Sequence, residues 1–275
     1  METSSYAQTQ SNSFAAMLNE VAKAVRLWPV WFRLGTWDVR RRYTRTSLGI
    51  AWIFLHLTIQ LAAVGFIYTI LLGQNVETFI PILATGLIIW GYLTSSIVEG
   101  GNAFITSEGY IKQIGLPIYI YVFRAFVSIT IVTLMSSLVY VVVAIVLRIP
   151  VDWGSLWALP GLVLLGVVSI LLIFTFAHLN SRFRDIGQLA LSAMQVLFYL
   201  TPVIWPADIL QKRGLSIVYE VNPLYHLLEI LRRPLLHAQR ADLVDYAFVL
   251  GLVALLAGSA VLVSWRFHRK VIYFL

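Results

Sequence analysis

The strongest constraint on the fold is a stretch of 31 residues without formal charge, 46–76, which directly follows a basic cluster. The cluster reads Arg40-Arg41-Arg42-Tyr43-Thr44-Arg45. About 20 apolar residues are enough for a helix to cross the hydrocarbon core of a bilayer, and basic residues accumulate at the cytoplasmic ends of such helices. This stretch therefore predicts a transmembrane helix that begins on the cytoplasmic side.

Five more charge-free stretches follow, each 20 to 29 residues long: 78–98, 125–147, 153–181, 186–207 and 246–265. Hydrophobic residues make up 59% of the chain and charged residues 12%, which excludes an ordinary soluble fold. Inside hydrocarbon every backbone polar group needs an internal partner, so these stretches are expected to be helices. The sequence predicts an all-α membrane protein with six transmembrane helices.

Basic residues near the ends of these stretches indicate the orientation. With the N-terminus in the cytoplasm, 11 lysines and arginines flank the inner ends and six flank the outer ends. This excess favours an N-in, C-in topology. The formal net charge is +7, but the cations gather at helix ends and form no continuous face, so we predict no nucleic-acid partner. The absence of cysteine excludes disulfides and thiol catalysis.

The residues before the first span divide into two parts. Residues 1–13 are polar and predict a disordered tail without a signal peptide. Residues 14–45 predict an amphipathic interface helix in the headgroup layer, which Pro29 breaks or kinks. Its apolar residues recur at spacings of three and four: Phe14, Leu18, Val21, Val25 and Trp28. It serves either as a simple membrane anchor or also as a docking site for a cytoplasmic subunit.

Two segments between spans are candidates for short helices. Residues 104–116 predict either a solvated loop or a short cytoplasmic helix with Ile111 and Ile114 on one side and a Glu108–Lys112 pair on another. Residues 205–240 are too apolar for a plain loop, and three prolines interrupt the surrounding segment. We expect re-entrant helices there, on the outer side. A seventh span is disfavoured because each charge at mid-bilayer costs about 2.5–3.5 kcal/mol, and four interrupt it: Glu220, Glu229, Arg232 and Arg233.

No catalytic or metal-binding pattern is found. The sequence lacks a phosphate-binding loop, a His-Glu-x-x-His zinc motif and a Gly-x-Ser-x-Gly elbow. His56 and His178 lie within predicted spans, where a proton relay is one interpretation and neutral, hydrogen-bonded histidines are the favoured one. Glu99 and Arg124, near the cytoplasmic ends of two spans, are interpreted as a structural ion pair, with a gate as the alternative. Because carboxylates are absent from the spans, energy for transport is expected to come from outside the chain.

Aromatic residues deep in the predicted spans are candidates for a path along which sugars move. Aromatic faces suit the apolar C–H faces of sugar rings, although packing between helices explains each single residue equally well. The candidate channel residues are Trp52, Tyr68, Trp90, Tyr92, Phe198 and Tyr199.

Four short motifs resemble those of ABC-2 type polysaccharide-export permeases, the membrane subunits of O-antigen, capsule and teichoic-acid exporters. Residues 42–52 (RYTRTSLGIAW) are similar to the family's entry into the first span. Residues 183–186 (FRDI), 200–205 (LTPVIW) and 222–225 (NPLY) look like three further family motifs and occur in the same order. One such match is weak, but four in order across the chain make a specific signal.

The resemblance implies an obligate homodimer, in which each copy binds a separate cytoplasmic ATPase. No cofactor is expected in this chain, because that ATPase subunit would bind ATP and magnesium. The resemblance also implies that residues 46–270 form the transmembrane domain and that 104–116 form the coupling helix, with its contacts at Glu108, Tyr110, Ile111 and Lys112. Gly109, Gly115 and the scarcity of basic residues there depart from the family's pattern.

The resemblance further implies a path for an undecaprenyl-linked polysaccharide through the bacterial inner membrane. Substrate would enter beside membrane lipid at the interface helix, near Arg40, Arg41, Arg42, Tyr43 and Arg45. The periplasmic gate would include Trp205, Asn222 and Pro223. We therefore expect a permease of O-antigen-type polysaccharide. The alternatives are export of capsule or teichoic acid, efflux of a small molecule and, from another class, an intramembrane glycan transferase.

Overall fold

The computed structural model describes residues 14–44, 47–207, 214–267 and 270–275, and all regular secondary structure in them is helical. Arg45 and the predicted tail 1–13 lie outside the described residues. The helices are α1 (Phe14–Arg26), α2 (Trp28–Thr44), α3 (Ala51–Leu72), α4 (Val76–Gly101), η1 (Ile105–Ser107), α5 (Glu108–Gln113), α6 (Tyr119–Val146), η2 (Trp153–Trp157), α7 (Ala158–Arg182), α8 (Ile186–Leu200), α10 (Ile217–Glu220), α11 (Pro223–His237), α12 (Leu243–Phe267) and α13 (Val271–Phe274).

Five segments of the described chain are long and apolar enough to cross a membrane: 51–70, 76–101, 119–146, 153–182 and 243–267. This confirms the all-α membrane class. The fifth predicted span, 186–207, contains only the 15-residue helix α8. At 1.5 Å per residue α8 is about 22 Å long, less than the roughly 30 Å of a hydrocarbon core. The count of six spans therefore stays a prediction.

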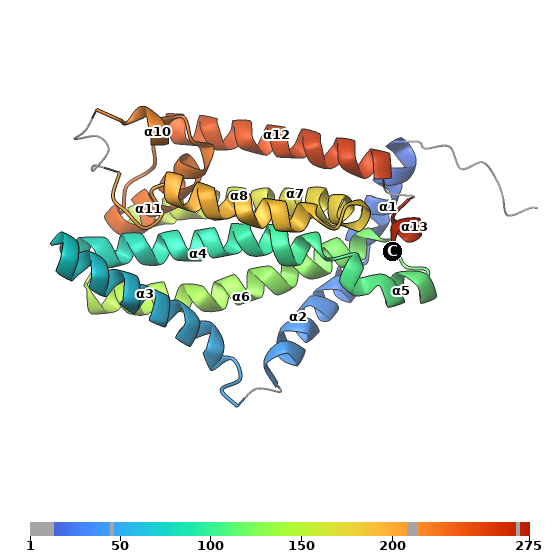
Figure 1. The fold of residues 1–275 in the computed structure, drawn as a ribbon, viewed down its shortest axis with the longest axis horizontal. Coiled ribbons are helices and arrows are strands. Elements are labelled where there is room, and N and C mark those ends of the chain that lie inside the picture. The colour runs from blue at the N-terminus through green and yellow to red at the C-terminus, as the bar shows by residue number, and fades with distance from the viewer. Residues whose placement is uncertain (1–13, 45–46, 208–213, 268–269) are drawn as a thin grey trace, which may run out of the picture.

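The bundle has two distinct ends. Figure 1 shows α4, α6, α7, α8 and α12 along the long axis, with α1, α5 and α13 gathered at one end and α10 and α11 at the other. We call the first the terminal end, because the described chain starts and finishes there, and the second the far end. The three short or amphipathic helices that the sequence would place in the cytoplasm thus share one end.

Helix α4 forms the centre of the bundle, and small residues on it allow α7 to approach closely. Ser96 of α4 and Ser169 of α7 are fully buried, and their hydroxyls are 2.6 Å apart. A Cβ atom added at Gly100 would lie 2.4 Å from Cγ1 of Ile173. A larger residue at that position would therefore push α7 away from α4.

The N-terminal segment forms two helices, α1 and α2, and the break between them lies next to Pro29, where the sequence indicated a break or kink. The break falls at Leu27, and α2 starts at Trp28, directly before Pro29. Proline lacks a backbone N–H and suits the first turn of a helix, so it ends one helix and begins the next. Helix α2 then packs against α6.

Replacing Gly35 with leucine is expected to weaken this packing. A Cβ atom at Gly35 would lie 2.8 Å from the backbone oxygen of Arg124 and 2.8 Å from Cβ of Val127. Overpacking of this kind costs about 1–3 kcal/mol, so the midpoint of thermal unfolding should fall. The control is Gly251→Leu on α12, where an added Cβ meets nothing within 4 Å. Equal midpoints for the two variants would contradict the close α2–α6 contact.

Candidate functional site

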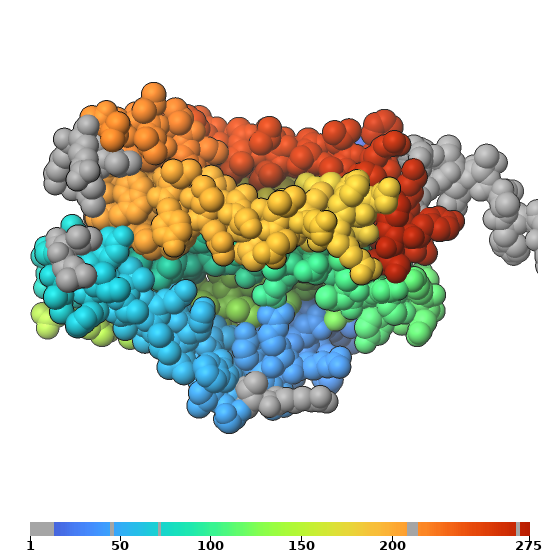
Figure 2. Space-filling model, viewed as in Figure 1, coloured from blue at the N-terminus to red at the C-terminus, as the bar shows by residue number. Residues whose placement is uncertain are grey.

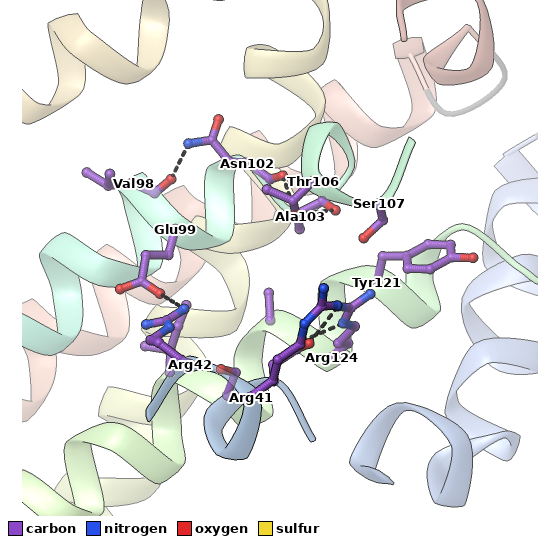
Figure 3. Close-up of a pocket in the computed structure, with 14 residues that line it drawn as sticks. Arg41, Arg42, Val98, Glu99, Asn102, Ala103, Thr106, Ser107, Tyr121 and Arg124 are labelled. Carbon is purple, nitrogen blue, oxygen red and sulfur yellow. Dashed lines mark hydrogen bonds and ion pairs between the residues drawn. The ribbon is translucent and has the colours of Figure 1, made fainter. Parts of the chain in front are cut away.

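A charged pocket of about 560 Å³ lies between α2, the end of α4 and the start of α6. Figure 3 shows Arg41 and Arg42 reaching up from α2 toward Glu99 of α4 and Arg124 of α6. Three guanidinium groups and two carboxylates line the pocket: Arg41, Arg42, Arg124, Asp38 and Glu99. The lining thus carries one net positive charge.

The ion pairs in this pocket differ from the pair that the sequence suggested. Arg42 Nη2 donates to Glu99 Oε2 over 2.6 Å. Arg124 binds Asp38 through both Nε (2.5 Å) and Nη2 (2.6 Å). The proposed Glu99–Arg124 pair is therefore wrong. Helix α2 supplies a nearer partner to both residues, Arg42 to Glu99 and Asp38 to Arg124. The positions of Glu99 and Arg124 at the ends of their spans could not indicate that α2 lies beside both of them.

Arg41 differs from the other two arginines of the pocket. Within the described part of the chain, no carboxylate lies within ion-pair distance of its side chain, which is exposed at the last turn of α2. Arg42 and Arg124 each already bind a carboxylate. Arg41 is thus the guanidinium available to an anion, and guanidinium groups match the geometry of phosphate and carboxylate oxygens.

A second, narrower crevice continues from the pocket toward the middle of the bundle. It has a volume of about 200 Å³, lies between α3, α4 and α6, and shares Arg42, Glu99 and Ile129 with the pocket. His56 and Gln60 of α3 contribute polar side chains to it. Figure 2 shows the corresponding hollow between α2 and α3, with α6 at its bottom. The Arg42–Glu99 ion pair therefore lies where the two cavities meet.

The short helix α5 is connected to this pocket. The guanidinium carbon of Arg124 lies 5.7 Å from the centroid of the Tyr110 ring. Phe104, just before α5, is fully buried, and its ring meets His178 of α7 edge-on at 5.0 Å. A force on α5 would thus reach both the pocket and the bundle core.

The outer surface of α5 carries the predicted ion pair. Lys112 Nζ donates to Glu108 Oε1 over 2.6 Å, which confirms the expected i,i+4 contact. Lys112 and, to a smaller degree, Arg184 lower the pKa of Glu108, so its carboxylate stays charged at neutral pH. Ile111 is buried, whereas Ile114, directly after the end of α5, is exposed.

At the far end, two of the sequence motifs meet. Asn222 caps α11 by accepting from the Leu224 backbone N–H (2.9 Å), and its amide donates to the Thr201 hydroxyl over 2.8 Å. Arg232 of α11 donates to three backbone oxygens, those of Pro202 (2.6 Å), Val203 (3.0 Å) and Ile82 (3.1 Å). We call this set the far-end junction.

A family model described as ABC-2 type transporter matches residues 31–236, well over half of the chain. The match runs from α2 through α11 and so includes the pocket, α5 and the far-end junction. The chain belongs to the ABC-2 type transporter family. It is therefore the multi-pass membrane part of a transporter and not an enzyme, which agrees with the lack of catalytic patterns.

Among the relatives of this ABC-2 chain are proteins named O-antigen export system permease protein RfbA. The protein from Myxococcus xanthus is 22% identical over 196 residues, which cover 70% of this chain and 74% of the relative. Two proteins from Klebsiella pneumoniae are 25% and 22% identical and cover 68% and 82% of this chain, respectively. These matches cover 72% and 87% of the respective relatives.

The predicted channel aromatics of this ABC-2 chain separate into groups. Trp90 of α4 meets Phe198 of α8 at 5.6 Å, and Phe198 meets Tyr199 at 5.4 Å. Tyr68 instead stacks on Phe79 at 5.0 Å, and Trp52 is 44% exposed on α3. The hydroxyl of Tyr92 lies 2.9 Å from that of Thr130 on α6. Their roles in transport stay predictions.

Sequence reasoning missed the most buried charged residues of the ABC-2 chain. In the sequence Arg232 indicates only a charge that argues against a seventh span, yet it is 5% exposed and holds the far-end junction together. The ring of His226 lies between Asp245 (Nδ1 to Oδ1, 2.6 Å) and the backbone oxygen of Glu220 (Nε2 to O, 2.7 Å). Both ring nitrogens thus face acceptors. The only sequence signal was the presence of charged residues in an apolar segment.

Proposed function

We propose that the chain is the membrane permease subunit of an ATP-binding-cassette exporter that moves lipid-linked O-antigen-type polysaccharide across the bacterial inner membrane. The observation that carries this proposal is the ABC-2 family match together with relatives that are named O-antigen export permeases and align over most of both chains. The charged pocket beside the interfacial helices is consistent with a substrate that has an anionic head.

For the topology we propose N-in, C-in, with the terminal end in the cytoplasm. The chain would cross the membrane six times, through α3, α4, α6, α7, α8 and α12, and α10 and α11 would be re-entrant on the periplasmic side. The excess of basic residues at the inner span ends supports this orientation. Helices α1 and α13, at the start and the end of the described chain, lie at the same end of the bundle as α5. A chain that starts and finishes on one side of a membrane crosses it an even number of times, which supports six crossings.

For the partners we propose a homodimer with two cytoplasmic ATPase subunits, which bind ATP and magnesium. Helix α5 would be the coupling helix, with Glu108, Tyr110, Ile111 and Lys112 as its contact residues. The connection from Tyr110 to Arg124 gives a physical route by which movement of α5 would alter the pocket. No titratable pathway through the spans is needed, because ATP hydrolysis outside the chain would supply the energy.

For the substrate path we propose that the phosphate of an undecaprenyl carrier binds Arg41 and competes with Glu99 for Arg42. Charge-assisted contacts of guanidinium with phosphate are among the stronger hydrogen bonds in proteins. The glycan would pass the aromatic ladder Trp90–Phe198–Tyr199, and the segment with Trp205, Asn222 and Pro223 would form the exit. The Trp205 indole donates to the Tyr199 backbone oxygen over 3.1 Å, which links ladder and exit.

The test is deletion of the gene in the organism that encodes it. We expect the lipopolysaccharide at the cell surface to lose its O-antigen ladder on gels, while lipid-linked polysaccharide accumulates inside the cell. A plasmid copy should restore the ladder. An intact ladder with loss of capsule or teichoic acid would assign the chain to another polymer, and intact surface polymers would refute polysaccharide export.

A Glu108→Arg variant is expected to reduce export at least about tenfold at normal protein levels, because it replaces an ion pair on the exposed surface of α5 by two like charges. ATP hydrolysis by the reconstituted complex should continue but no longer depend on substrate. Glu77→Arg, an exposed carboxylate in the first turn of α4, is the matched control and should export normally. Equal export by both variants would argue against coupling through α5.

A further inference from the structure

The crevice between α3, α4 and α6 contains polar side chains at the depth of the bilayer. His56 and Gln60 lie one helical turn apart on α3, and Ser95 of α4 lies one turn before Glu99. Gln60 is at the midpoint of the span 51–70, which carries no formal charge. Polar groups inside hydrocarbon cost free energy unless a hydrogen-bond partner reaches them. The crevice therefore requires a polar occupant.

Three of these side chains have no partner in the protein itself. Within the described part of the chain, no hydrogen bond joins the imidazole of His56, the amide of Gln60 or the hydroxyl of Ser95 to another residue. Both side chains of α3 are also exposed. By contrast, the Ser136 hydroxyl on α6 donates to the Val132 backbone oxygen over 3.0 Å. An imidazole, an amide and a hydroxyl thus stay available to a ligand.

A glycine on α4 leaves space in the crevice. Gly91 lines it and is exposed, and an added Cβ atom would meet nothing within 4 Å. Glycine inside a helix is less stable than alanine. Close packing explains Gly86 and Gly100 of the same helix, where an added Cβ would lie 2.4 Å from a neighbouring atom, but it does not explain Gly91. A larger residue at 91 would fill the crevice without pushing helices apart.

The lining of the crevice suits a sugar ring. Its available groups both donate and accept hydrogen bonds, and apolar side chains such as Leu57 and Val132 form other parts of the wall. A sugar has the same two features, because its hydroxyl groups surround a ring with apolar C–H faces. An isoprenoid chain would leave the amide and the imidazole without partners. An ion would find Arg42 and Glu99 already bound to each other (Figure 3).

The crevice also lies where the substrate would bring a sugar. It shares Arg42, Glu99 and Ile129 with the charged pocket. A ligand whose phosphate binds Arg41 and Arg42 therefore places the next chemical group at the mouth of the crevice. In a lipid-linked glycan, the phosphate has an isoprenoid chain on one side and a sugar on the other, and only the sugar matches the polar lining.

We propose that the α3–α4–α6 crevice binds the sugar that is joined to the carrier phosphate, and that Gln60, His56 and Ser95 recognise its hydroxyl groups. This inference rests on the proposed function and adds which part of the substrate the permease recognises. The isoprenoid chain would stay in the surrounding bilayer. Recognition of the sugar would distinguish a loaded carrier from an empty one, which has the same phosphate and the same lipid chain.

The experiment measures the binding of two lipids to the full-length permease in lipid nanodiscs. One is the lipid-linked glycan that accumulates in the deletion strain, and the other is the same carrier lipid after its glycan has been removed. Gly91→Phe fills the crevice, and Gly251→Phe on α12, with nothing within 4 Å of its Cβ, is the matched control. Gln60→Leu removes the amide, and its control is Thr58→Val, which is exposed on α3 outside the crevice.

We expect wild type and both controls to bind the glycan-bearing lipid at least about tenfold more tightly than the bare carrier. Gly91→Phe should lose this preference but bind the bare carrier like wild type. Gln60→Leu should lower the preference about fivefold, the effect of one hydrogen bond. An unchanged preference in Gly91→Phe would overturn the inference and leave the proposed function intact.

Two other results would also overturn the inference. A wild type that binds neither lipid would refute the proposed substrate, and the inference with it. If Gly91→Phe converted a dimer into monomers and weakened both lipids equally, a second copy of the chain would cover the crevice in place of a sugar. The oligomeric state of each variant is therefore measured by size-exclusion chromatography in the same preparations.

Discussion

An Arg232→Met variant is expected to lose about 3 kcal/mol or more of folding stability, because hydrogen bonds from a charged group contribute about 1.5–3 kcal/mol each. Arg232 is 5% exposed, and its guanidinium donates to the backbone oxygens of Pro202, Val203 and Ile82. Methionine fills similar space, and the Ile82 oxygen keeps the Thr85 hydroxyl as a donor (3.0 Å), but the buried oxygens of Pro202 and Val203 lose the guanidinium. Each of these oxygens then adds a penalty of about 1–3 kcal/mol unless water enters.

The contact of the Arg232 guanidinium with the three backbone oxygens also depends on glycine at position 86. A Cβ added at Gly86 of α4 would lie 2.4 Å from Arg232 Nη2 and 2.6 Å from the Val203 oxygen. Only glycine at 86 leaves room for the guanidinium between α4 and the turn after α8. Arg232→Lys should therefore rescue little, because one ammonium group cannot reach three oxygens in a fork geometry.

Two quantities are measured. The first is the midpoint of thermal unfolding, monitored by fluorescence-detected size-exclusion chromatography, and the second is export in cells. Arg240→Met is the control, since Arg240 is exposed just beyond α11 and makes no ion pair among the described residues. We expect the control to unfold like wild type and to export. If Arg232→Met matched the control, the far-end junction would contribute nothing to stability.

Reversing the charge at Arg41 is expected to reduce export by roughly tenfold to a hundredfold, because losing one charge-assisted hydrogen bond costs about 1.5–3 kcal/mol. Arg41→Glu changes the pocket lining from three guanidinium groups against two carboxylates to two against three. The pocket would then repel an anionic head. Stability should change little, because Arg41 is exposed and binds no carboxylate within the described chain.

The matched control for Arg41→Glu is Arg40→Glu. Arg40 is also exposed, is the preceding residue of α2 and does not line the pocket. Both variants alter the charge of the interfacial helix equally, so attraction to anionic lipid changes equally. Export should fall for Arg41→Glu and remain near wild type for Arg40→Glu. Equal losses would mean that the helix acts only through its total charge.

The spans were predictable because a single physical rule governs them. Charges are costly in hydrocarbon, so the uncharged stretches mark the buried helices, and five agree with the structure. The stretch 186–207 contains a helix shorter than its charge-free length, because absence of charge does not define helix length. Helix α8 ends at Leu200, and the following Thr201-Pro202 turn is held by Asn222 and Arg232, residues more than 20 positions away.

The amphipathic segment 14–45 shows the same limit of sequence reasoning. Periodicity located its apolar residues and Pro29 indicated a break, but neither could show where α2 would lie. Close packing at Gly35 brings α2 against α6, so that Asp38 and Arg42 reach Arg124 and Glu99. The charged pocket, which we consider the best candidate for substrate entry, exists only because of that contact.

The amino-acid sequence by itself determined that this protein is a helical membrane protein, where its spans lie and to which family its motifs point. These features follow from local composition and from short patterns, which need no knowledge of distant residues. Only the tertiary structure decided which charges pair, that Arg41 has no carboxylate partner among the described residues, and how the outer motifs join through Arg232. Pairing depends on distances of a few ångströms between segments up to 150 residues apart, and packing alone sets those distances.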